Sequence, residues 1–297
     1  MFHKILCMTD LTQASHQAVR IAARLARDVD AELVLAHVCH DPALAYASDY
    51  QLTPVTIDKV QADAKGAIEA VSAEAIGLGA TRTSTRVVAG IPSEQIVAIA
   101  QDPTFDLIVV GTHARTGVGR FLFGSVAEMV VRHAPCSVLV ARGEAGPFRR
   151  VVCSFDFSDA SHEALHLAGE LARDALTLVH AVELPPWYSS EPTIVRFLDK
   201  LDHRAAQLLE IAVKEVEQQT KAHVSSRARF GGVASQVLAI VANDPEVDLV
   251  VVGSHGHAGI RHALVGSVAG ELIRHARCSV LVARSRTTHA NERSHAA

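Results

Sequence analysis

The chain has 297 residues, a length that suits two domains of about 150 residues each. Its formal net charge of −4 excludes an overall basic field that would draw it to nucleic acid or to an anionic membrane. No apolar run reaches the roughly 18 residues of a membrane span, and the start of the chain lacks the apolar core of a signal peptide. We therefore expect a cytoplasmic protein.

Alternating patterns predict the order β-α-β-α-β-α-β-α-β in each half of the chain. Apolar β-branched runs indicate buried strands, and apolar stripes of helical period indicate amphipathic helices. The first half should hold elements at residues 3–9, 15–28, 32–38, 55–78 and 82–90, then a short helix from Ser93. Their counterparts in the second half are residues 150–155, 161–174, 176–182, 194–221 and 225–232, then a short helix from Ser235. Such alternation predicts parallel, doubly wound sheets.

The last part of each half is a duplicated stretch. Residues 106–142 and 248–284 align without a gap, and 22 of the 37 positions are identical. Each copy opens with a short apolar run that indicates a strand buried on both faces. A glycine ends this strand, a loop follows, a Gly-Ser pair opens an amphipathic helix with the serine as its expected N-cap, and a last apolar strand closes the copy.

The glycines of this stretch favour a phosphate site. The second copy carries Gly253, Gly256 and Gly266 followed by Ser267, whereas the first copy has Ala114 in the middle position. The free N–H groups and the dipole at the start of the following helix attract anions, phosphate above all. Glycine also occurs in turns for its own sake, so a strand–loop–helix turn without a ligand is the alternative reading.

With these residues the sequence resembles a tandem universal stress protein. The nucleotide-binding signature of that family is G-x2-G-x9-G-[ST], which residues 253–267 match in full and residues 111–125 match except at Ala114. The resemblance implies two five-stranded parallel sheets of order 3-2-1-4-5, one domain at residues 1–143, a second at 148–286 and a flexible tail at 287–297. Because single-domain relatives dimerise through their last strand, the halves are expected to pack as an internal pseudo-dimer.

That strand order predicts where a ligand would bind. The order reverses between strands 1 and 4, and ligands of such sheets bind at the carboxyl ends of the strands beside the reversal. Asp10 should therefore face Gly111, and Asp156 should face Gly253. The alternative for both aspartates is a helix N-cap or a turn residue.

The resemblance implies an adenine nucleotide site in each half, with ATP as the ligand and Mg²⁺ travelling with it. Asp10 and Asp156 would contact the nucleotide, and Val38 would pack against adenine, although it could equally be core. The expected contacts of the first half are Thr9, Asp10, Thr12, Val38, Gly111, Thr112, His113, Arg115, Gly124, Ser125 and Val126. Those of the second half are Phe155, Asp156, Ser158, Ala181, Gly253, Ser254, His255, Gly256, Gly266, Ser267 and Val268.

The cysteines and histidines give no sign of disulfides or of a metal site. Four of the five cysteines recur in pairs on apolar strands and indicate buried, reduced thiols, whereas Cys39 has no counterpart and is expected to be partly exposed. The 17 histidines are scattered without the spacing of a metal site, even where His255, His257 and His262 lie close in sequence. No catalytic base is placed beside a nucleophile.

The leading hypothesis is therefore an ATP-binding stress-response regulator or sensor without fast catalysis. The rivals are a nucleotide-free interaction module and a slow ATP hydrolase or self-phosphorylating protein, since phosphoryl transfer needs a cationic clamp and a positioned base that the sequence does not identify. Ala114 adds a methyl group near the expected phosphate, so we expect the second site to bind ATP more tightly. Exposed sheet edges predict a homo-oligomer.

Overall fold

A computed structural model of the chain describes residues 1–40, 54–102, 104–112, 124–143, 146–182, 192–255 and 266–284. The elements of the first half are β1 Lys4–Met8, α1 Gln13–Val29, β2 Glu32–His40, α3 Pro54–Gly77, β3 Thr83–Gly90, α4 Pro92–Ala100, β4 Leu107–Gly111, α5 Ser125–His133 and β5 Ser137–Ala141. Those of the second half are β6 Arg150–Ser154, α6 Asp159–Leu171, β7 Ala175–Val182, α7 Pro192–Glu217, β8 His223–Phe230, α8 Val233–Asn243, β9 Val247–Gly253, α9 Ser267–His275 and β10 Ser279–Ala283.

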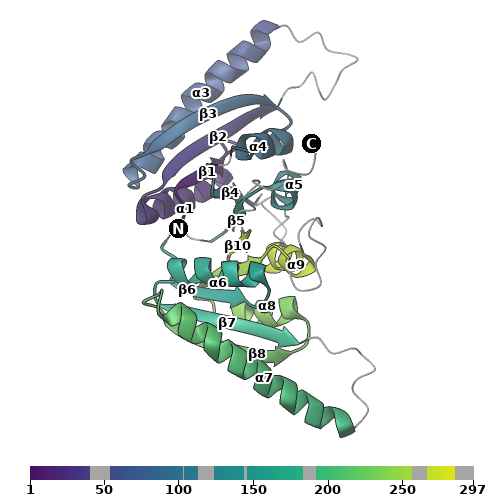
Figure 1. Ribbon diagram of the computed structural model, residues 1–297. Coiled ribbons are helices and arrows are strands. Elements are labelled where there is room, and N and C mark those ends of the chain that lie inside the picture. The colour runs from purple at the N-terminus through teal and green to yellow at the C-terminus, as the bar shows by residue number, and fades with distance from the viewer. Residues whose placement is uncertain are drawn as a thin grey trace, which may run out of the picture.

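All ten strands form one sheet of order β3-β2-β1-β4-β5-β10-β9-β6-β7-β8. Within each half the neighbours are parallel and the order is the expected 3-2-1-4-5, so the predicted fold class is confirmed. The halves meet where β5 and β10 pair antiparallel, with Leu139 opposite Leu281. This pairing is the internal pseudo-dimer that the family resemblance implied, and Figure 1 shows the two halves joined there.

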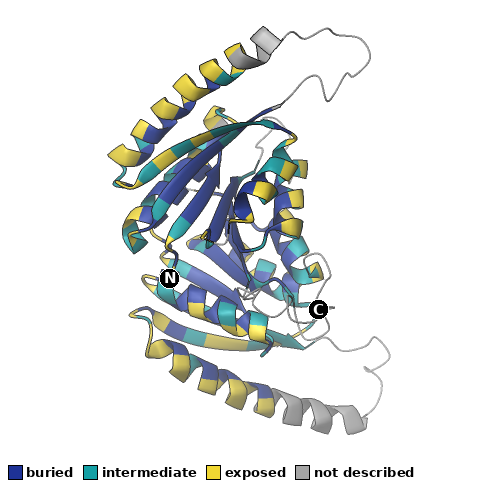
Figure 2. Cartoon of the chain, turned by 45° about the horizontal axis from the view of Figure 1, so that its top comes forward, coloured by how far each residue is buried: buried dark blue, intermediate teal, exposed yellow. Residues whose placement is uncertain are grey.

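Helices cover both faces of the sheet, and each face has its own apolar core. One core lies under α1, α3, α6 and α7, and the other lies under α4, α5, α8 and α9 (Figure 1). The central strands are buried on both faces, whereas α3 and α7 carry their exposed residues on the outside (Figure 2). Strand β5 is apolar along its whole length and fully buried, because helices cover both faces of the sheet.

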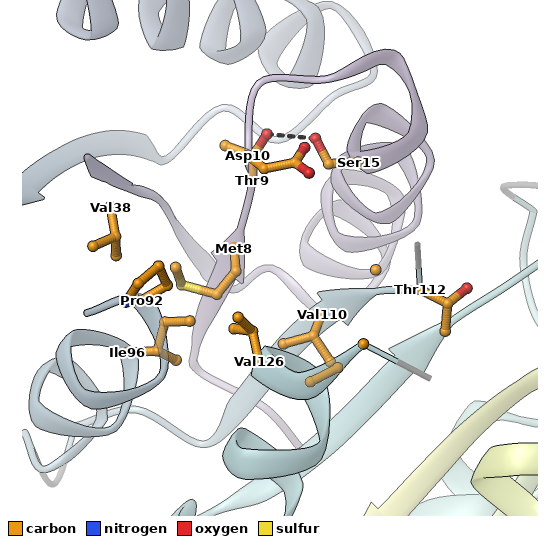
Figure 3. Close-up of a pocket in the computed structure, with 13 residues that line it drawn as sticks. Met8, Thr9, Asp10, Ser15, Val38, Pro92, Ile96, Val110, Thr112 and Val126 are labelled. Carbon is orange, nitrogen blue, oxygen red and sulfur yellow. Dashed lines mark hydrogen bonds between the residues drawn. The ribbon is translucent and has the colours of Figure 1, made fainter. Parts of the chain in front are cut away.

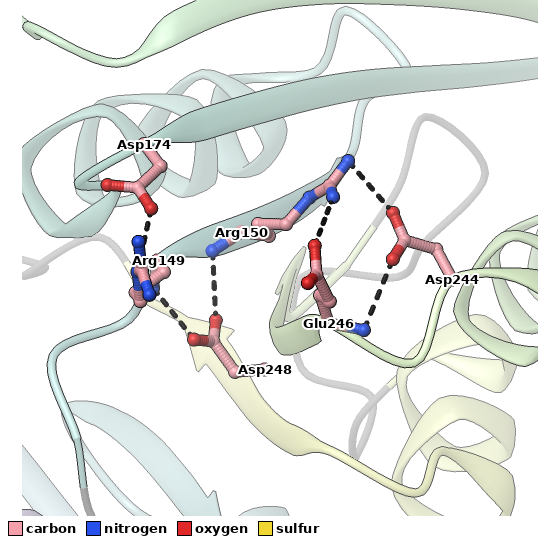
Figure 4. Close-up of polar contacts among 6 residues, drawn as sticks. All are labelled: Arg149, Arg150, Asp174, Asp244, Glu246 and Asp248. Carbon is pink, nitrogen blue, oxygen red and sulfur yellow. Dashed lines mark hydrogen bonds and ion pairs between the residues drawn. The ribbon is translucent and has the colours of Figure 1, made fainter.

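An aspartate anchors the amino end of the first strand in each half. Asp248 accepts hydrogen bonds from the backbone N–H groups of Arg149 (2.7 Å) and Arg150 (3.2 Å), and Asp106 accepts them in the same way from His3 and Lys4. The Arg150 side chain pairs with Asp244 and Glu246 beside it (Figure 4). Burial raises the pKa of the Asp248 carboxyl. These contacts lie at the amino ends of the strands, opposite the carboxyl ends where the ligand site is predicted.

All five cysteines are buried and unpaired, as expected for four of them. The prediction for Cys39 is wrong, because this residue is only 5% exposed on β2. Because Cys39 has no matching cysteine in the second half, the repeat pattern gave no sign that it is buried. The expected tail at residues 287–297 lies outside the described residues. Within the part of the chain that the structure describes, no helix is both long and apolar enough to cross a membrane.

Candidate functional site

A cavity of about 200 Å³ lies at the carboxyl ends of β1, β2 and β4 in the first half. Its walls come from β1, β2, β4 and the start of α1 together with α4 and α5, which is the place where the strand order reverses. The lining residues are Met8, Thr9, Asp10, Ser15, Val38, Pro92, Ile96, Val110, Gly111, Thr112, Gly124, Val126 and Ala127. Asp10 and Gly111 therefore border one cavity, where the topology had placed them.

The cavity has an apolar end and a polar end. Val38, Met8, Pro92 and Ile96 lie together at one side in Figure 3, and Thr112 lies at the other. Val38 is only 8% exposed, so it belongs to the core and to the cavity wall at once. An apolar slot with a few polar groups at its rim suits a flat ring that carries a polar substituent.

Asp10 is held in a tight turn rather than at a helix cap. Its Oδ1 accepts hydrogen bonds from the Thr12 backbone N–H (3.0 Å) and the Thr12 hydroxyl (2.6 Å). Thr12, not Asp10, occupies the N-cap position of α1. Leu11 between them has φ 61, a left-handed conformation that residues other than glycine rarely adopt. The exposed Asp10 carboxylate thus faces the cavity from a fixed loop.

The second half repeats this turn. Asp156 accepts from the Ser158 N–H at 3.0 Å and from the Ser158 hydroxyl, and Phe157 has φ 66. Ser158 also caps α6 by accepting from the Ser161 N–H at 3.3 Å. Since both halves hold the same unusual backbone, the position of the two carboxylates is a repeated property of the fold.

Histidines on the second strand of each half brace this loop. The Nδ1–H of His37 donates to the Thr9 carbonyl and that of His180 to the Phe155 carbonyl, each at 2.9 Å. The Phe155 side chain is 1% exposed and packs against Phe157, so it belongs to the core rather than to a binding surface. Sequence reasoning missed these histidines, although both occupy the same place in their strands.

The helices expected to receive phosphate begin one residue earlier than predicted. Gly124 and Gly266 occupy the N-cap positions of α5 and α9, and Ser125 and Ser267 are the first helical residues. The predicted serine caps are therefore wrong, because the glycines occupy the cap positions and no side-chain cap bond forms. The first backbone N–H groups of such a helix have no partner within the helix and point beyond its start.

Packing requires one of the signature glycines, Gly253, but not Gly266. A Cβ on Gly253 would lie 2.9 Å from the Ala160 carbonyl group, so α6 could not pack against β9 with any other residue there. The Gly266 N–H donates to the Ser254 carbonyl at 2.9 Å, and a Cβ would lie 3.4 Å from that oxygen, an ordinary van der Waals distance. Glycine is therefore needed at position 253 with or without a ligand, whereas packing alone does not require it at position 266.

The remaining predicted residues of the second half lie at the ends of several elements or outside the described residues. Ser254 is 6% exposed, and its hydroxyl is 3.0 Å from Nδ1 of His255. Ala181 and Val268 are half-buried, at the end of β7 and the start of α9. His113, Ala114, Arg115, Gly256, His257 and His262 lie outside the described residues.

The two helix starts differ in charge. Glu128 lies in the first turn of α5, whereas α9 has no acidic residue in its first turn because Gly270 takes the equivalent position. A carboxylate at a helix start competes with an anionic ligand for the same positive end of the dipole. The start of α9 is therefore the more attractive place for phosphate.

Other parts of the site were not identified from sequence. Met8, Ser15, Pro92 and Ile96 line the cavity, and the Ser15 hydroxyl lies 2.8 Å from that of Thr9 (Figure 3). Proline at the first turn of α4, directly after β3, was the signal that could have placed α4 over the strand ends. Among the described residues no cluster of His, Cys, Asp and Glu could hold a metal ion.

Comparisons with known proteins point to one family. The profile of the universal stress protein family matches residues 1–142 and again residues 147–284. A universal stress protein of Methanocaldococcus jannaschii is 31% identical over 143 residues, which cover 48% of this chain and 83% of that protein. A putative universal stress protein of Staphylococcus aureus is 31% identical over 147 residues, or 49% of this chain and 87% of that protein.

Two solved structures share the whole architecture. The structure of a universal stress protein from Archaeoglobus fulgidus has a TM-score of 0.68 at 18% identity and covers 95% of this chain and 98% of that one. The structure of a putative universal stress protein from Pseudomonas aeruginosa has a TM-score of 0.65 at 17% identity and covers 96% and 94%. The likeness runs through both halves of the chain, so the tandem fold recurs in these proteins.

Proposed function

The chain belongs to the universal stress protein family and carries the family's domain twice, and from this premise we propose that it binds adenine nucleotides and acts as a stress-response sensor or regulator rather than as a fast enzyme. ATP, accompanied by Mg²⁺, is the proposed ligand. One nucleotide would lie in each half, at the carboxyl ends of the strands beside the reversal of strand order.

The cavity of the first half carries this proposal. Its apolar side, with Val38 and Ile96, would hold the adenine ring, and the Asp10 carboxylate at its rim would accept hydrogen bonds from the ribose or hold Mg²⁺. Gly124 at the start of α5 borders the same cavity, so the phosphates would lie against the first N–H groups of that helix. The base, ribose and phosphates of a single nucleotide would thus contact these three parts of the cavity.

The same residues argue against fast phosphoryl transfer. Asp10 is the only ionisable side chain among the described residues that line the cavity. Transfer of a phosphoryl group requires cations around the phosphate and a group that positions the attacking oxygen. A carboxylate held by Thr12 at the rim supplies neither a cationic clamp nor a mobile base.

The first experiment is the identification and titration of the ligand. Mass spectrometry of the small molecules released from the purified chain should find adenine nucleotide, and calorimetric titration with Mg-ATP should give up to two sites per chain. Absence of binding after incubation with Mg-ATP rejects the proposal and favours an interaction module. Phosphate release at an ordinary enzymatic rate would favour a catalyst instead.

Two matched substitutions test the location of the sites. Val38→Trp places a large ring in the cavity of the first half, and Ala181→Trp does so at the equivalent position of the second half. Each variant should lose one of the two binding events and keep the other. Unchanged titrations for both variants, with folding verified by circular dichroism, would show that nucleotide binds elsewhere.

A further inference from the structure

A second cavity lies between α5 and α9, at the junction of the two halves (Figure 1 shows the two helices there). Its volume is also about 200 Å³, and residues of both helices line it. Glu128 and Arg132 come from the first half, and Gly266, Ser267, Gly270 and Arg274 come from the second. The start of α9, where the second nucleotide is proposed to place its phosphates, therefore opens into a cleft that the other half helps to form.

The cleft holds two guanidinium groups but only one carboxylate. Arg132 is engaged, since its Nε and Nη2 donate to Oε1 of Glu128 at 3.2 and 2.8 Å. Arg274 is the equivalent residue of α9, and Gly270 stands where a glutamate would pair with it. Within the described residues no carboxylate pairs with Arg274, so one cationic group of the cleft is available to a ligand.

Gly270 also lets Arg274 reach toward the start of its own helix. A Cβ at Gly270 would lie 3.4 Å from Nη1 of Arg274, so the guanidinium lies over the surface that a side chain would cover. Gly270 follows Gly266 by four residues, a rise of about 6 Å along the helix. The guanidinium is thus about one turn away from the first N–H groups of α9.

We propose that this cleft receives the terminal phosphates of the nucleotide bound in the second half, and that Arg274, assisted by Arg132 from the first half, selects a triphosphate over a monophosphate. The inference rests on the proposed nucleotide binding. The innermost phosphate would lie at the first N–H groups of α9, and the outer ones would run along the cleft to the guanidinium groups. Arginine suits this role because its planar donors bind two phosphate oxygens at once.

The first half lacks this arrangement. Glu128 occupies the position of Gly270 and already binds Arg132, the counterpart of Arg274. In the first half the matching guanidinium is therefore already paired with a carboxylate of its own helix and is less available to outer phosphates. The two sites should therefore differ in their preference: strong discrimination between ATP and AMP in the second half, and weak discrimination in the first.

The test compares ATP, ADP and AMP by calorimetric titration of the full chain, in a Val38→Trp background that leaves the second site. Arg274→Gln should lower ATP affinity about tenfold or more, the effect of losing one charge-assisted contact, and should leave AMP affinity within about twofold. Arg132→Gln should have a smaller effect of the same kind. Arg204→Gln, an exposed arginine on the outer helix α7, is the control and should change neither.

A second variant guards against damage to the fold. Gly270→Glu gives α9 the glutamate that α5 has, which would pair with Arg274 and favours the helix, so reduced ATP affinity could not be ascribed to unfolding. Nucleotide binding with an unchanged ATP-to-AMP ratio in Arg274→Gln and Gly270→Glu would overturn the inference and leave the proposed function standing. No nucleotide binding by the wild-type chain would reject both.

Discussion

At the scale of single residues, the loops that carry Asp10 and Asp156 hold a strained residue in the same place. Leu11 and Phe157 both have positive φ, and both side chains pack partly against the core. The left-handed conformation costs a residue with a Cβ roughly 1–2 kcal/mol. The core contact of the side chain offsets this cost, which explains why a large apolar residue occurs where glycine would be expected.

This balance predicts an unusual order of stabilities. Leu11→Ala loses the apolar contact and keeps the strain, so it should lower the free energy of unfolding by about 1–2 kcal/mol. Leu11→Gly loses the same contact but removes the strain, so it should be at least as stable as the alanine variant. Urea denaturation of the two variants measures the difference. An alanine variant clearly more stable than the glycine variant would contradict the backbone argument.

The buried thiols give a prediction about pH. Burial raises the pKa of Cys136 and of Cys278 to about 12 and raises the pKa of Cys7, Cys39 and Cys153 as well. Since only the thiolate reacts, a free thiol with a pKa near 8.5 is partly reactive at pH 8, whereas Cys136 and Cys278 are almost wholly protonated. Alkylation of these two cysteines in the native chain at pH 8 should be at least about 100-fold slower than after unfolding in urea. Rapid labelling of a native cysteine, located by mass spectrometry, would show local opening.

At the scale of elements, each half caps the last helix of the other. Arg142, after β5, donates to the carbonyls of Ala276 (2.7 Å) and Ile273 (2.5 Å) at the end of α9. Arg284, after β10, donates to Val131 at 2.6 Å and also to Ala134 at the end of α5. Cations stabilise the negative end of a helix and satisfy its last carbonyls. Burial lowers the pKa of both guanidinium groups.

Removal of one cap should destabilise the junction strongly. Arg142→Met keeps much of the apolar volume but leaves buried carbonyls of α9 without a donor, so the free energy of unfolding should fall by about 2–4 kcal/mol. The exposed Arg229→Met on β8 serves as the matched control and should change it by less than about 0.5 kcal/mol. Guanidinium-induced unfolding followed by circular dichroism compares them. Equal stability of the two variants would show that these carbonyls find other partners.

Features set by residues close together in the chain could be predicted from the sequence, whereas contacts between distant residues could not. Strands and helices followed from local periodicity, and the duplication at 106–142 exposed the tandem organisation. The strand order needed the family resemblance, since periodicity does not order strands. The cross-capping by Arg142 joins residues more than 130 positions apart, and the burial of Cys39 depends on its neighbours in space. Such contacts leave no local pattern.

The candidate site shows the same limit. Asp10 and Gly111 could be placed together because topology fixes the carboxyl ends of strands 1 and 4. The cavity walls from α4 and the cleft between α5 and α9 could not be predicted from the sequence, because the position of a helix over a sheet depends on side-chain packing. The contrast between Glu128 and Gly270 was visible in the aligned copies. Its meaning appears only when Arg132 and Arg274 are seen to face one cleft.

At the scale of the whole molecule, the ten-stranded sheet has two outer edges, β3 and β8, and one internal seam at β5 and β10. Val138, Leu139 and Val140 pair with Val282, Leu281 and Val280 across that seam, and all are buried. Assembly of full chains through β3 or β8 stays a prediction, which light scattering of the purified chain can test. The seam itself makes a sharper prediction about the separated halves.

Residues 1–143 produced alone should form a dimer. Without the second half, β5 exposes an unpaired apolar edge, and a second copy offers the same strand for antiparallel pairing. Arg142 of each copy could then cap α5 of the other, as Arg284 does in the full chain. Light scattering should give twice the fragment mass, and Arg142→Met should shift the fragment toward monomer at the same concentration. A fragment that is monomeric at micromolar concentration and keeps native circular dichroism would show that covalent linkage, rather than the seam and its two arginines, holds the halves together.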